Sequence, residues 1–548
     1  MAVEDSFLAL MAFTLIEAYF LQRTMLANQS FRTVVLSSLA VNVFLKGLYV
    51  IVIWPLFINP LRHLPKVPGF MSNLKFFDFP RRRRPLHWMT TIPNEGLIHL
   101  HDILGQSYLL ATNHQALLDV MSTNSYDFEK PRRARNFIAR ILGFGLVMSE
   151  GAAHKKQRKA LTPAFNIKNI RVMYSLMWDK TNQFLEEVEK ELKLSPMEGT
   201  NPADGEGKLE IGEWASRLTL DIIGPAAMGR DFRSLQKCDN PVAQSFFRIL
   251  SPTTEKMAFF AMNFILPPWL AQRVPWRLNK IITHEANFLR DLCTDIVRDK
   301  RKAIAMSKSS VKDLEADILG TLVLGGDFSD SELVDQMLTF LTGGHETTAR
   351  TITWACYLLT QHPDIQERLR AEIREKIPYA NAPITYQDLE SLPLLNGVCQ
   401  EILRLYPTFP ATLRESIRDT VIAGEPIPKG TRVILCPYAI NRSPVFWGDD
   451  GEGFLPERWI DKDKNGNLVP NNTGGTSTNF AQMTFLHGHR SCIGKDFARA
   501  ELRCAMAGVV GRFAFEMQDP TQEIHITGVL TTQPVEGMHL RMHRVDAW

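Results

Sequence analysis

A ten-residue segment near the carboxyl end of the chain carries the residue types best suited to chemistry. It reads Phe485-Leu486-His487-Gly488-His489-Arg490-Ser491-Cys492-Ile493-Gly494. A thiolate that binds iron has to be presented by a tight loop, in which glycine permits the turn and backbone N–H groups hydrogen-bond the sulfur. A single cysteine is otherwise usually an inert apolar residue of the core. The arginine and glycines around Cys492 favour the metal-binding interpretation.

The segment fits the pattern F-x-x-G-x-R-x-C-x-G at every fixed position. In this it resembles the cytochrome P-450 family of haem-thiolate monooxygenases. The resemblance implies that Cys492 is the proximal iron ligand of haem b (iron protoporphyrin IX), that Phe485 and Gly488 belong to the loop that holds it, and that Arg490 pairs with a haem propionate.

Two more segments resemble propionate-binding parts of the family. One is Pro410-Ala411-Thr412-Leu413-Arg414, and the other is His154-Lys155-Lys156-Gln157-Arg158, which is similar to a W-x-x-x-R helix. His154 stands where the family often has tryptophan, but an imidazole can also donate to a carboxylate. The resemblance therefore assigns propionate contacts to Arg414, Arg158 and His154, and His154 is not expected to bind the iron.

A structural triad is expected from two separated segments. Glu401-Ile402-Leu403-Arg404 resembles the family's E-x-x-R, and Phe454-Leu455-Pro456-Glu457-Arg458-Trp459 resembles its F-x-P-E-R segment. Residues three apart share a helix face, so Glu401 and Arg404 can form a charge-assisted pair, to which the loop adds Arg458. E-x-x-R alone is a common surface pair, and its position ahead of the other motifs, in the family's order, makes it informative.

The segment Gly343-Gly344-His345-Glu346-Thr347-Thr348 is similar to the family's A/G-G-x-E/D-T-T. Adjacent glycines inside a helix cost roughly 1 kcal/mol each relative to alanine, and room for dioxygen would explain them. The resemblance assigns Glu346 and Thr347 the catalytic role of organising the water that supplies protons to dioxygen. A capping or back-bonding threonine is the alternative.

The elements that must position these residues are mostly helical. Ser329-Asp330-Ser331-Glu332 has the form of a capping box and predicts a central helix that continues to about Gln361. Apolar periodicity predicts further helices, and short alternating runs predict strands. The expected helices are Val172 to Leu192, Asn279 to Met306 and Asp364 to Glu375, and the expected strands are Gln106 to Thr112, Thr431 to Pro437 and His539 to His543. The predicted class is mainly α with small β-sheets, a cytochrome P-450 fold. Ser195 to Lys208 and Asn465 to Thr478 are predicted loop insertions.

Two apolar stretches at the amino terminus predict a membrane anchor. Phe7 to Leu21 is interrupted by Glu17, and Thr33 to Ile58 is interrupted by Asn42 and Lys46. The second stretch exceeds the roughly 20 residues that cross a bilayer, and we expect it to span. Whether the first stretch also crosses, giving a hairpin, stays open. Acidic residues at the start of the chain disfavour a cleaved signal peptide.

These features divide the chain into three expected parts. Residues 1–60 form the anchor, with a span at about 33–58 and a possible second span at 7–21, residues 61–69 form a proline-rich hinge, and residues 70–548 form the catalytic domain. Basic residues in the hinge favour the cytosolic side of an endoplasmic reticulum membrane. Seven cysteines without close pairs indicate no disulfide framework and a reducing compartment.

The expected partners follow from the resemblance and from composition. No flavin or nicotinamide fingerprint occurs, in keeping with electrons that come from NADPH through a separate NADPH-cytochrome reductase. Basic residues between His154 and Lys159 suit an acidic docking surface on that partner. The other expected partners are O2 and a lipid membrane. A formal net charge of +3 over 548 residues names no partner by itself, and no nucleic-acid partner is expected.

The substrate is expected to be a lipophilic small molecule with a terpenoid, polyketide, fatty acyl or sterol skeleton. Met257 to Leu270 is strongly apolar and is expected near an access channel and the membrane, with core packing as an equal alternative. The expected pocket walls are Phe409, Ala411, Thr412, Leu341 and Val529. The chain resembles membrane-bound eukaryotic, fungal biosynthetic, members. The alternatives are a haem-thiolate isomerase or dehydratase that needs no reductase, and a non-catalytic haem-binding protein.

Overall fold

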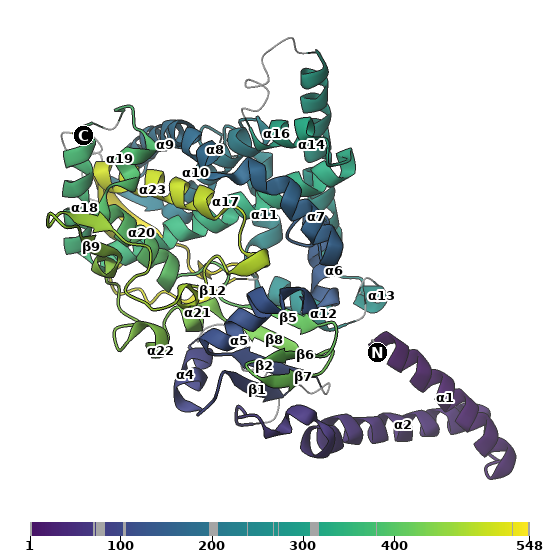
Figure 1. Cartoon of the computed structure of the whole chain (residues 1–548). Coiled ribbons are helices and arrows are strands. Elements are labelled where there is room, and N and C mark those ends of the chain that lie inside the picture. Colours follow the sequence, from purple (N-terminus) through teal and green to yellow (C-terminus); the bar gives the residue numbers. More distant parts are fainter. Residues whose placement is uncertain are drawn as a thin grey trace.

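A computed structural model describes residues 3–69, 72, 83–101, 106–196, 206–237, 239–266, 268–271, 273–306, 317–379, 381–528, 530–545 and 548 of the chain. Cys238, Val529, part of the basic run at 81–84 and most of the loop at 195–208 lie outside the described residues. The described chain is a mainly helical body with small sheets, from which two N-terminal helices project (Figure 1). The predicted fold class is confirmed.

The helices of the body surround one long central helix, α17, which packs against α10, α14 and α23 (Figure 1). Their bounds are α4 (Arg84–Thr91), α5 (His114–Leu118), α6 (Arg132–Leu142), α7 (Gly151–Leu161), α8 (Ile167–Val172), α9 (Tyr174–Leu194), α10 (Ile211–Ile223), α11 (Pro241–Leu250), α12 (Thr254–Ile265), α13 (Pro268–Ala271), α14 (Arg277–Met306), α16 (Ile318–Gly325), α17 (Asp330–Gln361), α18 (Pro363–Lys376), α19 (Tyr386–Glu390), α20 (Pro393–Leu405), α21 (Pro437–Ile440), α22 (Pro444–Trp447) and α23 (Lys495–Arg512). Short 3-10 and π-helical turns are η4 (Asp119–Thr123), η5 (Ser125–Asp127), η6 (Thr162–Phe165), η8 (Gly224–Met228), η9 (Pro456–Trp459), η10 (Asn479–Ala481) and η11 (Gly488–Arg490).

The start of α17 is set by the predicted capping box. The Ser329 hydroxyl accepts from the Glu332 N–H, and the Glu332 carboxylate accepts from the Ser329 N–H at 2.8 Å. Two orphan donors of the first helical turn are thereby satisfied. The other predicted helices, observed as α9, α14 and α18, begin and end within two residues of their predicted bounds.

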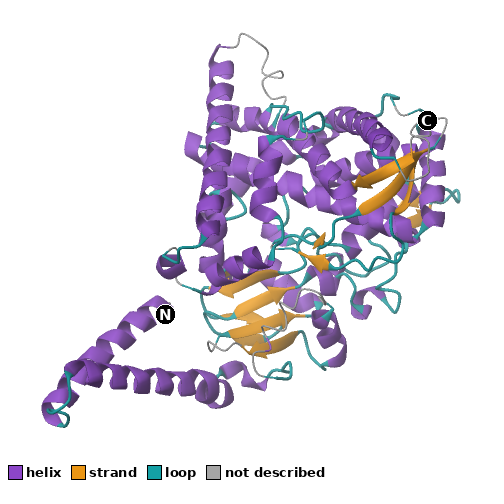
Figure 2. Ribbon diagram, turned by 180° about the vertical axis from the view of Figure 1, so that it is seen from behind, coloured by secondary structure: helices purple, strands orange, loops and turns teal. Residues whose placement is uncertain are grey.

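The strands form one five-stranded sheet and several smaller ones (Figure 2). The larger sheet has the order β1-β2-β8-β5-β3, with β2 and β8 parallel and the other pairs antiparallel. The strands are β1 (Leu97–His101), β2 (Ser107–Ala111), β3 (Phe128–Glu129), β4 (Glu206–Glu210), β5 (Thr412–Ser416), β6 (Thr420–Ile422), β7 (Glu425–Ile427), β8 (Arg432–Leu435), β9 (Ile460–Lys462), β10 (Leu468–Pro470), β11 (Phe513–Met517), β12 (Ile526–Thr527), β13 (Gln533–Pro534) and β14 (His539–Arg544). The three predicted strands are observed as β2, β8 and β14.

The expected hinge is joined to the body by its backbone. The Val67 N–H donates to the His99 carbonyl at 3.0 Å, and the His99 N–H donates to the Pro65 carbonyl at 2.7 Å. Leu61 and Leu64 are also buried in the apolar core around the five-stranded sheet. The segment therefore lies along β1 as part of the body, which fixes where the projecting helices leave it.

The two N-terminal apolar stretches are α1 (Val3–Thr24) and α2 (Phe31–Leu48), and α2 continues into a π-helical segment, η1 (Tyr49–Ile58), before the short turn η2 (Pro60–His63). One helical segment among the described residues, Phe31–Ile58, is long and apolar enough to cross a bilayer. The polar interruptions of the two stretches meet, since the Asn42 amide donates to the Glu17 carboxylate at 2.6 Å and to the Thr14 hydroxyl at 3.1 Å. The two helices pack against each other along this contact.

Two sequence expectations are refined by the fold. The apolar segment 257–270 forms α12 and α13, and its Phe259 and Phe260 are buried against Phe137 with ring centroids 5.7 Å and 4.9 Å apart. Core packing, the second of the two interpretations, accounts for these two side chains. The insertion at 465–478 is not loop throughout, because β10 within it pairs with β9.

Candidate active site

The loop that carries Cys492 is a tight turn whose geometry requires its glycine. Leu486 and Gly488 adopt positive φ angles of 54° and 66°, and the Cys492 N–H donates to the Phe485 carbonyl at 2.8 Å. A Cβ atom at Gly488 would lie 2.0 Å from the Met121 carbonyl oxygen, so no other residue fits there. The loop is directly followed by α23, which packs against α17.

The Cys492 side chain is solvent-accessible, although the surrounding protein still desolvates its thiol. Burial raises the pKa of the thiol, while the Gly494 N–H and the nearby Arg158 guanidinium lower it. Arg158 itself donates to the Ser491 carbonyl at 2.6 Å. These donors favour the thiolate, and a bound metal ion deprotonates a coordinating thiol outright.

A cluster of buried charges lies beside this loop, and we call it the basic cradle: Lys130, Glu150, Arg414 and Arg490. Arg490 forms an ion pair with Glu150, and Lys130 lies 3.4 Å from the same carboxylate. Burial, reinforced by Arg414, lowers the pKa of Lys130 to about 7, although Glu150 raises it. Burial also lowers the pKa of Arg414 to about 10, which Arg490 reinforces.

The basic cradle fits a ligand with two negative charges. Two guanidinium groups and the Lys130 amine surround one carboxylate, and among the described residues Arg490 Nε and Nη2 have no hydrogen-bond acceptor although both atoms are buried. A buried charge without a partner is strongly unfavourable, and Arg is suited to bidentate binding of carboxylates. The two propionates of a haem would supply the missing charge and the missing acceptors. The residues present therefore fit that cofactor.

The predicted propionate ligands do not all belong to the basic cradle. Arg490 and Arg414 do, whereas Arg158 is bonded to Ser491 in the cysteine loop. His154 is buried, and its Nδ1 lies 3.4 Å from the Tyr126 hydroxyl. Burial, together with Arg490 and Lys130, lowers the pKa of His154 to about 4, so it is a neutral imidazole at physiological pH.

The two glycines of the central helix have different surroundings. A Cβ atom at Gly343 would meet nothing within 4 Å, whereas one at Gly344 would lie 2.6 Å from Ile223 Cδ1 on α10. Gly343 therefore opens a space beside the helix, and Gly344 permits close packing of α17 against α10. Sequence reasoning assigned both glycines to room for dioxygen, and only Gly343 has the open surroundings which that role requires.

Glu346 and Thr347, which were expected to act together, face different partners. The Thr347 hydroxyl donates to the Gly343 carbonyl at 2.5 Å, as a back-bonding threonine does, and its oxygen can still accept from water. Glu346 is buried and accepts from the Thr531 hydroxyl at 2.8 Å, with Arg350 Nη2 at 3.8 Å. Burial raises the pKa of Glu346, and Arg350 and Thr531 oppose that rise.

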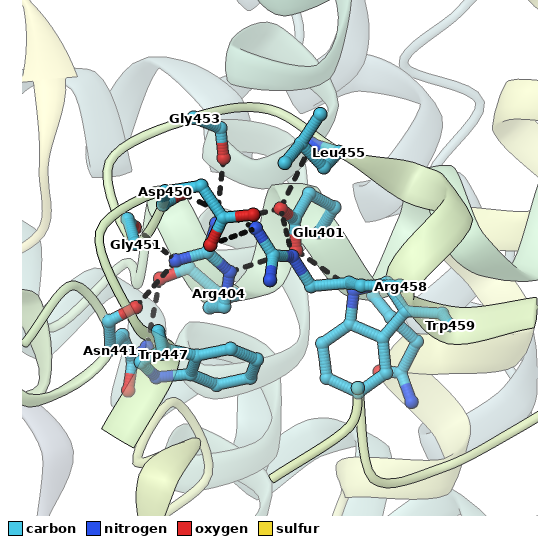
Figure 3. A network of polar contacts seen from close by, with 12 residues as sticks. Glu401, Arg404, Asn441, Trp447, Asp450, Gly451, Gly453, Leu455, Arg458 and Trp459 are labelled. Atoms are coloured by element: carbon cyan, nitrogen blue, oxygen red, sulfur yellow. Dashed lines mark hydrogen bonds and ion pairs between the residues drawn. The ribbon is translucent and has the colours of Figure 1, made fainter. Parts of the chain in front are cut away.

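The three residues of the expected triad come together in one network, in which Glu401 and Arg404 are completely buried (Figure 3). Arg404 donates to Glu401 through Nη2 at 2.6 Å and Nε at 2.8 Å, and Arg458 Nε reaches the same carboxylate at 3.0 Å. The remaining guanidinium protons of Arg404 go to the carbonyls of Asn441, Gly451 and Gly453. All five N–H groups of Arg404 thus have acceptors, which permits complete burial of its charge.

Comparison with known proteins decides the family. Residues 68–541 match the family model described as Cytochrome P-450. The chain belongs to the cytochrome P-450 family. It is 36% identical over 528 residues to the cytochrome P-450 monooxygenase sphH of Aspergillus fumigatus, covering 94% of this chain and 93% of the relative. It is 35% identical to the cytochrome P-450 monooxygenase FUM15 of Gibberella moniliformis (90% of each chain) and 34% identical to the cytochrome P-450 monooxygenase ALT8 of Alternaria alternata (90% and 92%).

Membership of the cytochrome P-450 family defines the reaction class. The chain is a haem-thiolate monooxygenase, an oxidoreductase that acts on a small molecule with O2 and electrons from a redox partner. Among the expected pocket walls, Phe409 is 46% exposed, and Ala411 and Thr412 are partly buried. Leu341 is completely buried in the helical core and so contributes no open surface. Val529 lies outside the described residues.

Three residues of this site escaped sequence reasoning. Lys130 belongs to none of the motifs found in the sequence, and Glu150 is the N-terminal cap residue of α7, the helix that carries His154 and Arg158. An acid one helical turn before His154 is a signal that the sequence did contain. Thr531 had none, because its contact with Glu346 spans 185 residues.

Proposed function

We propose that this cytochrome P-450 hydroxylates or epoxidises a lipophilic small molecule in secondary-metabolite biosynthesis, with a terpenoid or polyketide skeleton. One observation supports the catalytic centre above all: a single loop leaves Cys492 accessible and places Arg490 in the basic cradle, where its Nε and Nη2 are buried without hydrogen-bond acceptors among the described residues. The named fungal monooxygenases to which the chain is similar support the biosynthetic context.

The residues of the chain divide the work around the cofactor. A bound haem supplies the iron at which dioxygen is activated, with the Cys492 thiolate as its ligand. The basic cradle orients the haem through its propionates, and the triad of Glu401, Arg404 and Arg458 holds the surrounding loops in place. Thr347, beside the open space at Gly343, positions water, and Glu346 exchanges protons with that water.

Electrons come from NADPH through a separate reductase, and a basic surface supports docking of that partner. Lys155, Lys156 and Lys159 are exposed along α7, the helix whose inner side holds His154 and Arg158 beside the cysteine loop. Charge complementarity with an acidic partner speeds association and fixes orientation. The apolar segment Phe31–Ile58 anchors the enzyme in the endoplasmic reticulum membrane, and the catalytic domain faces the cytosol.

The experiment is turnover of the reconstituted enzyme with reductase, NADPH and isotopically labelled dioxygen, on a substrate identified by comparing metabolites of deletion and overexpression strains. We expect one labelled oxygen atom in each oxidised product, and Thr347→Val should bind haem normally but divert electrons to peroxide. Thr348→Val, rotated by about 100° on the helix, should affect product yield less. Unlabelled product formed without NADPH would instead support an isomerase or dehydratase.

A further inference from the structure

The Glu346 carboxyl is held by a residue from the far end of the chain. Thr531 lies between β12 and β13, and its hydroxyl donates to Glu346 Oε1 at 2.8 Å. Both residues are buried, with 6% and 3% of their surface exposed. A buried carboxyl and a buried hydroxyl that satisfy each other are a specific pair, since either group alone would lose a hydrogen bond at a substantial cost.

The turn that presents Thr531 is itself fixed to α17 and to the loop after α20. The Thr532 N–H donates to the Thr408 carbonyl at 2.8 Å, and the Trp354 indole N–H donates to the Thr532 carbonyl at 3.2 Å. Gly528 has a φ angle of 139°, and a Cβ atom there would lie 1.6 Å from the Thr531 carbonyl oxygen. The hydroxyl of Thr531 therefore reaches Glu346 from a backbone with little freedom.

The charged groups around Glu346 are few, so the hydrogen bond from Thr531 influences the protonation of its carboxyl. Arg350, one turn later on α17, is the charged group that acts on the carboxyl among the described residues, and its Nη2 lies 3.8 Å away. His345, its neighbour on the helix, has its pKa lowered to about 3 by burial and is neutral. The β12–β13 turn contributes hydroxyl and backbone groups but no charge at this point. A hydrogen bond to the ionised form favours that form, so Thr531 helps Glu346 to release a proton.

We propose that Thr531 is a positioning residue for proton delivery, which orients the Glu346 carboxyl and favours its ionised form. This inference rests on the proposed role of Glu346 in the monooxygenase reaction. Thr531 touches neither dioxygen nor haem in this assignment and acts through Glu346 alone. The hydroxyl, and not the shape of the side chain, is the part that matters.

The test compares Thr531→Val, which keeps the shape and removes the hydroxyl, with Thr531→Ser, which keeps the hydroxyl. Full-length enzymes are assayed with reductase for product formed per NADPH as a function of pH. In Thr531→Val the coupling profile should move by about one pH unit toward higher pH, because the carboxyl holds its proton more tightly. Thr531→Ser should match the wild type. Thr532→Val should also match it, because Thr532 lies in the same turn as Thr531 but its hydroxyl faces the Pro407 carbonyl and not Glu346.

A second readout does not depend on turnover. Glu346→Gln assigns the infrared C=O absorption of protonated Glu346. The band that this substitution removes from the spectrum of the ferric protein belongs to that carboxyl group. In Thr531→Val this absorption should persist to higher pH and lie at higher frequency, since the carbonyl loses its hydrogen bond. Thermal denaturation of each variant identifies any general loss of folding.

The possible failures are distinguishable. If Thr531→Val keeps the wild-type profile and absorption while Glu346→Gln loses coupling, the inference is wrong and the proposed function stands. If Glu346→Gln retains full coupling, the role of Glu346 and the inference fail together. An equal shift in Thr531→Ser or Thr532→Val would assign the effect to the fold of the turn and would also overturn the inference.

Discussion

At the scale of single residues, unbalanced buried charge is the clearest trace of the cofactor in this structure. Lys130, Arg414 and Arg490 share one carboxylate, that of Glu150, and buried guanidinium atoms of Arg490 lack acceptors among the described residues. Folding alone does not favour such an arrangement, because each uncompensated charge opposes burial. A dianionic ligand converts the same cluster into a stabilising one.

Lys130→Met should weaken haem retention while leaving the cysteine ligand in place. The change removes one of three cations of the basic cradle and a charged hydrogen bond worth about 1.5 to 3 kcal/mol, so haem should dissociate roughly tenfold to a hundredfold faster. Transfer of haem to an excess of apomyoglobin measures this rate. Lys156→Met, an exposed lysine on α7, is the matched control. Equal transfer rates for Lys130→Met and the wild type would remove Lys130 from the basic cradle.

The residues that sequence reasoning found and those it missed differ in one respect. Cys492, Arg490, Glu401 and Arg404 stand in short motifs whose members are close in the chain. Thr531 and Lys130 act through contacts between distant segments, and no local pattern predicts them. The partner of Glu346 is likewise a tertiary contact, so the sequence could assign Glu346 and Thr347 to one task but could not show that each has a different hydrogen-bond partner.

At the scale of elements, α20 and the loop before η9 are joined through one carboxylate. Glu401 accepts from both arginines, from the Leu455 N–H at 3.0 Å and from the Trp459 indole N–H at 2.8 Å. The helix, the loop and the turn are thus positioned together. Removal of this carboxylate would leave several buried donors without an acceptor.

Glu401→Ala should destabilise the enzyme by roughly 3 to 5 kcal/mol, because it leaves buried charges of Arg404 and Arg458 uncompensated. Thermal denaturation and haem content per polypeptide both report the effect. Glu457→Ala serves as control, since Glu457 pairs with Arg368 at the surface and such pairs contribute at most about 1 kcal/mol. Normal haem content and an unchanged denaturation midpoint in Glu401→Ala would contradict the structural role.

The helix α23 contains a buried acid, Glu501, whose pKa burial raises well above its usual value. The folded chain keeps this proton at pH values where the unfolded chain has lost it. The resulting stability is complete below the unfolded pKa and is lost as pH rises toward the folded pKa, by up to about 1.4 kcal/mol per pH unit.

Glu501→Gln, which is neutral at every pH, should therefore flatten the decline of stability that begins as pH rises above the unfolded glutamate pKa of about 4.3. The difference between the thermal denaturation midpoint of the variant and that of the wild type should shift in favour of the variant as pH rises. The exposed Glu516 offers a control, as Glu516→Gln should leave the pH profile unchanged. Parallel profiles for Glu501→Gln and the wild type would show that Glu501 is ionised in the folded chain.

At the scale of the whole molecule, a hairpin of two helices leaves the body beside the five-stranded sheet (Figure 1). The contact of Asn42 with Glu17 and Thr14 removes the main objection to inserting α1, since Glu17, the acidic residue within its apolar stretch, has a partner. Interhelical hydrogen bonds of this kind stabilise membrane helix pairs by about 0.6 to 2 kcal/mol. We therefore expect α1 and α2 to enter the bilayer together.

A hairpin would place both ends of the chain on the same side of the membrane, which we propose is the cytosolic side. In sealed microsomes, protease should then remove tags fused to the amino terminus and to the carboxyl terminus. A protected amino-terminal tag would indicate that only Phe31–Ile58 spans, and a protected carboxyl-terminal tag would overturn the cytosolic orientation. A lumenal marker protein, protected in the same sample, controls for vesicle integrity.

Fold class, the central helix and the order of motifs along the chain followed from the sequence, because capping boxes, apolar periodicity and short motifs are local. The attachment of residues 65–67 to β1 and the burial of Phe259 and Phe260 did not follow. Both depend on which distant segment of the chain lies alongside. The composition of an apolar or proline-rich segment is compatible with several positions in the fold and does not choose among them.

The central claim is that Cys492 holds the haem iron as a thiolate, and the spectrum of the reduced carbon monoxide complex tests it most directly. Wild-type protein should give the strongly red-shifted Soret band of a thiolate-bound haem. Cys492→Ala should lose that band entirely, whereas Cys436→Ser, a buried cysteine outside the loop, should keep it. Retention of the red-shifted band in Cys492→Ala would contradict the claim.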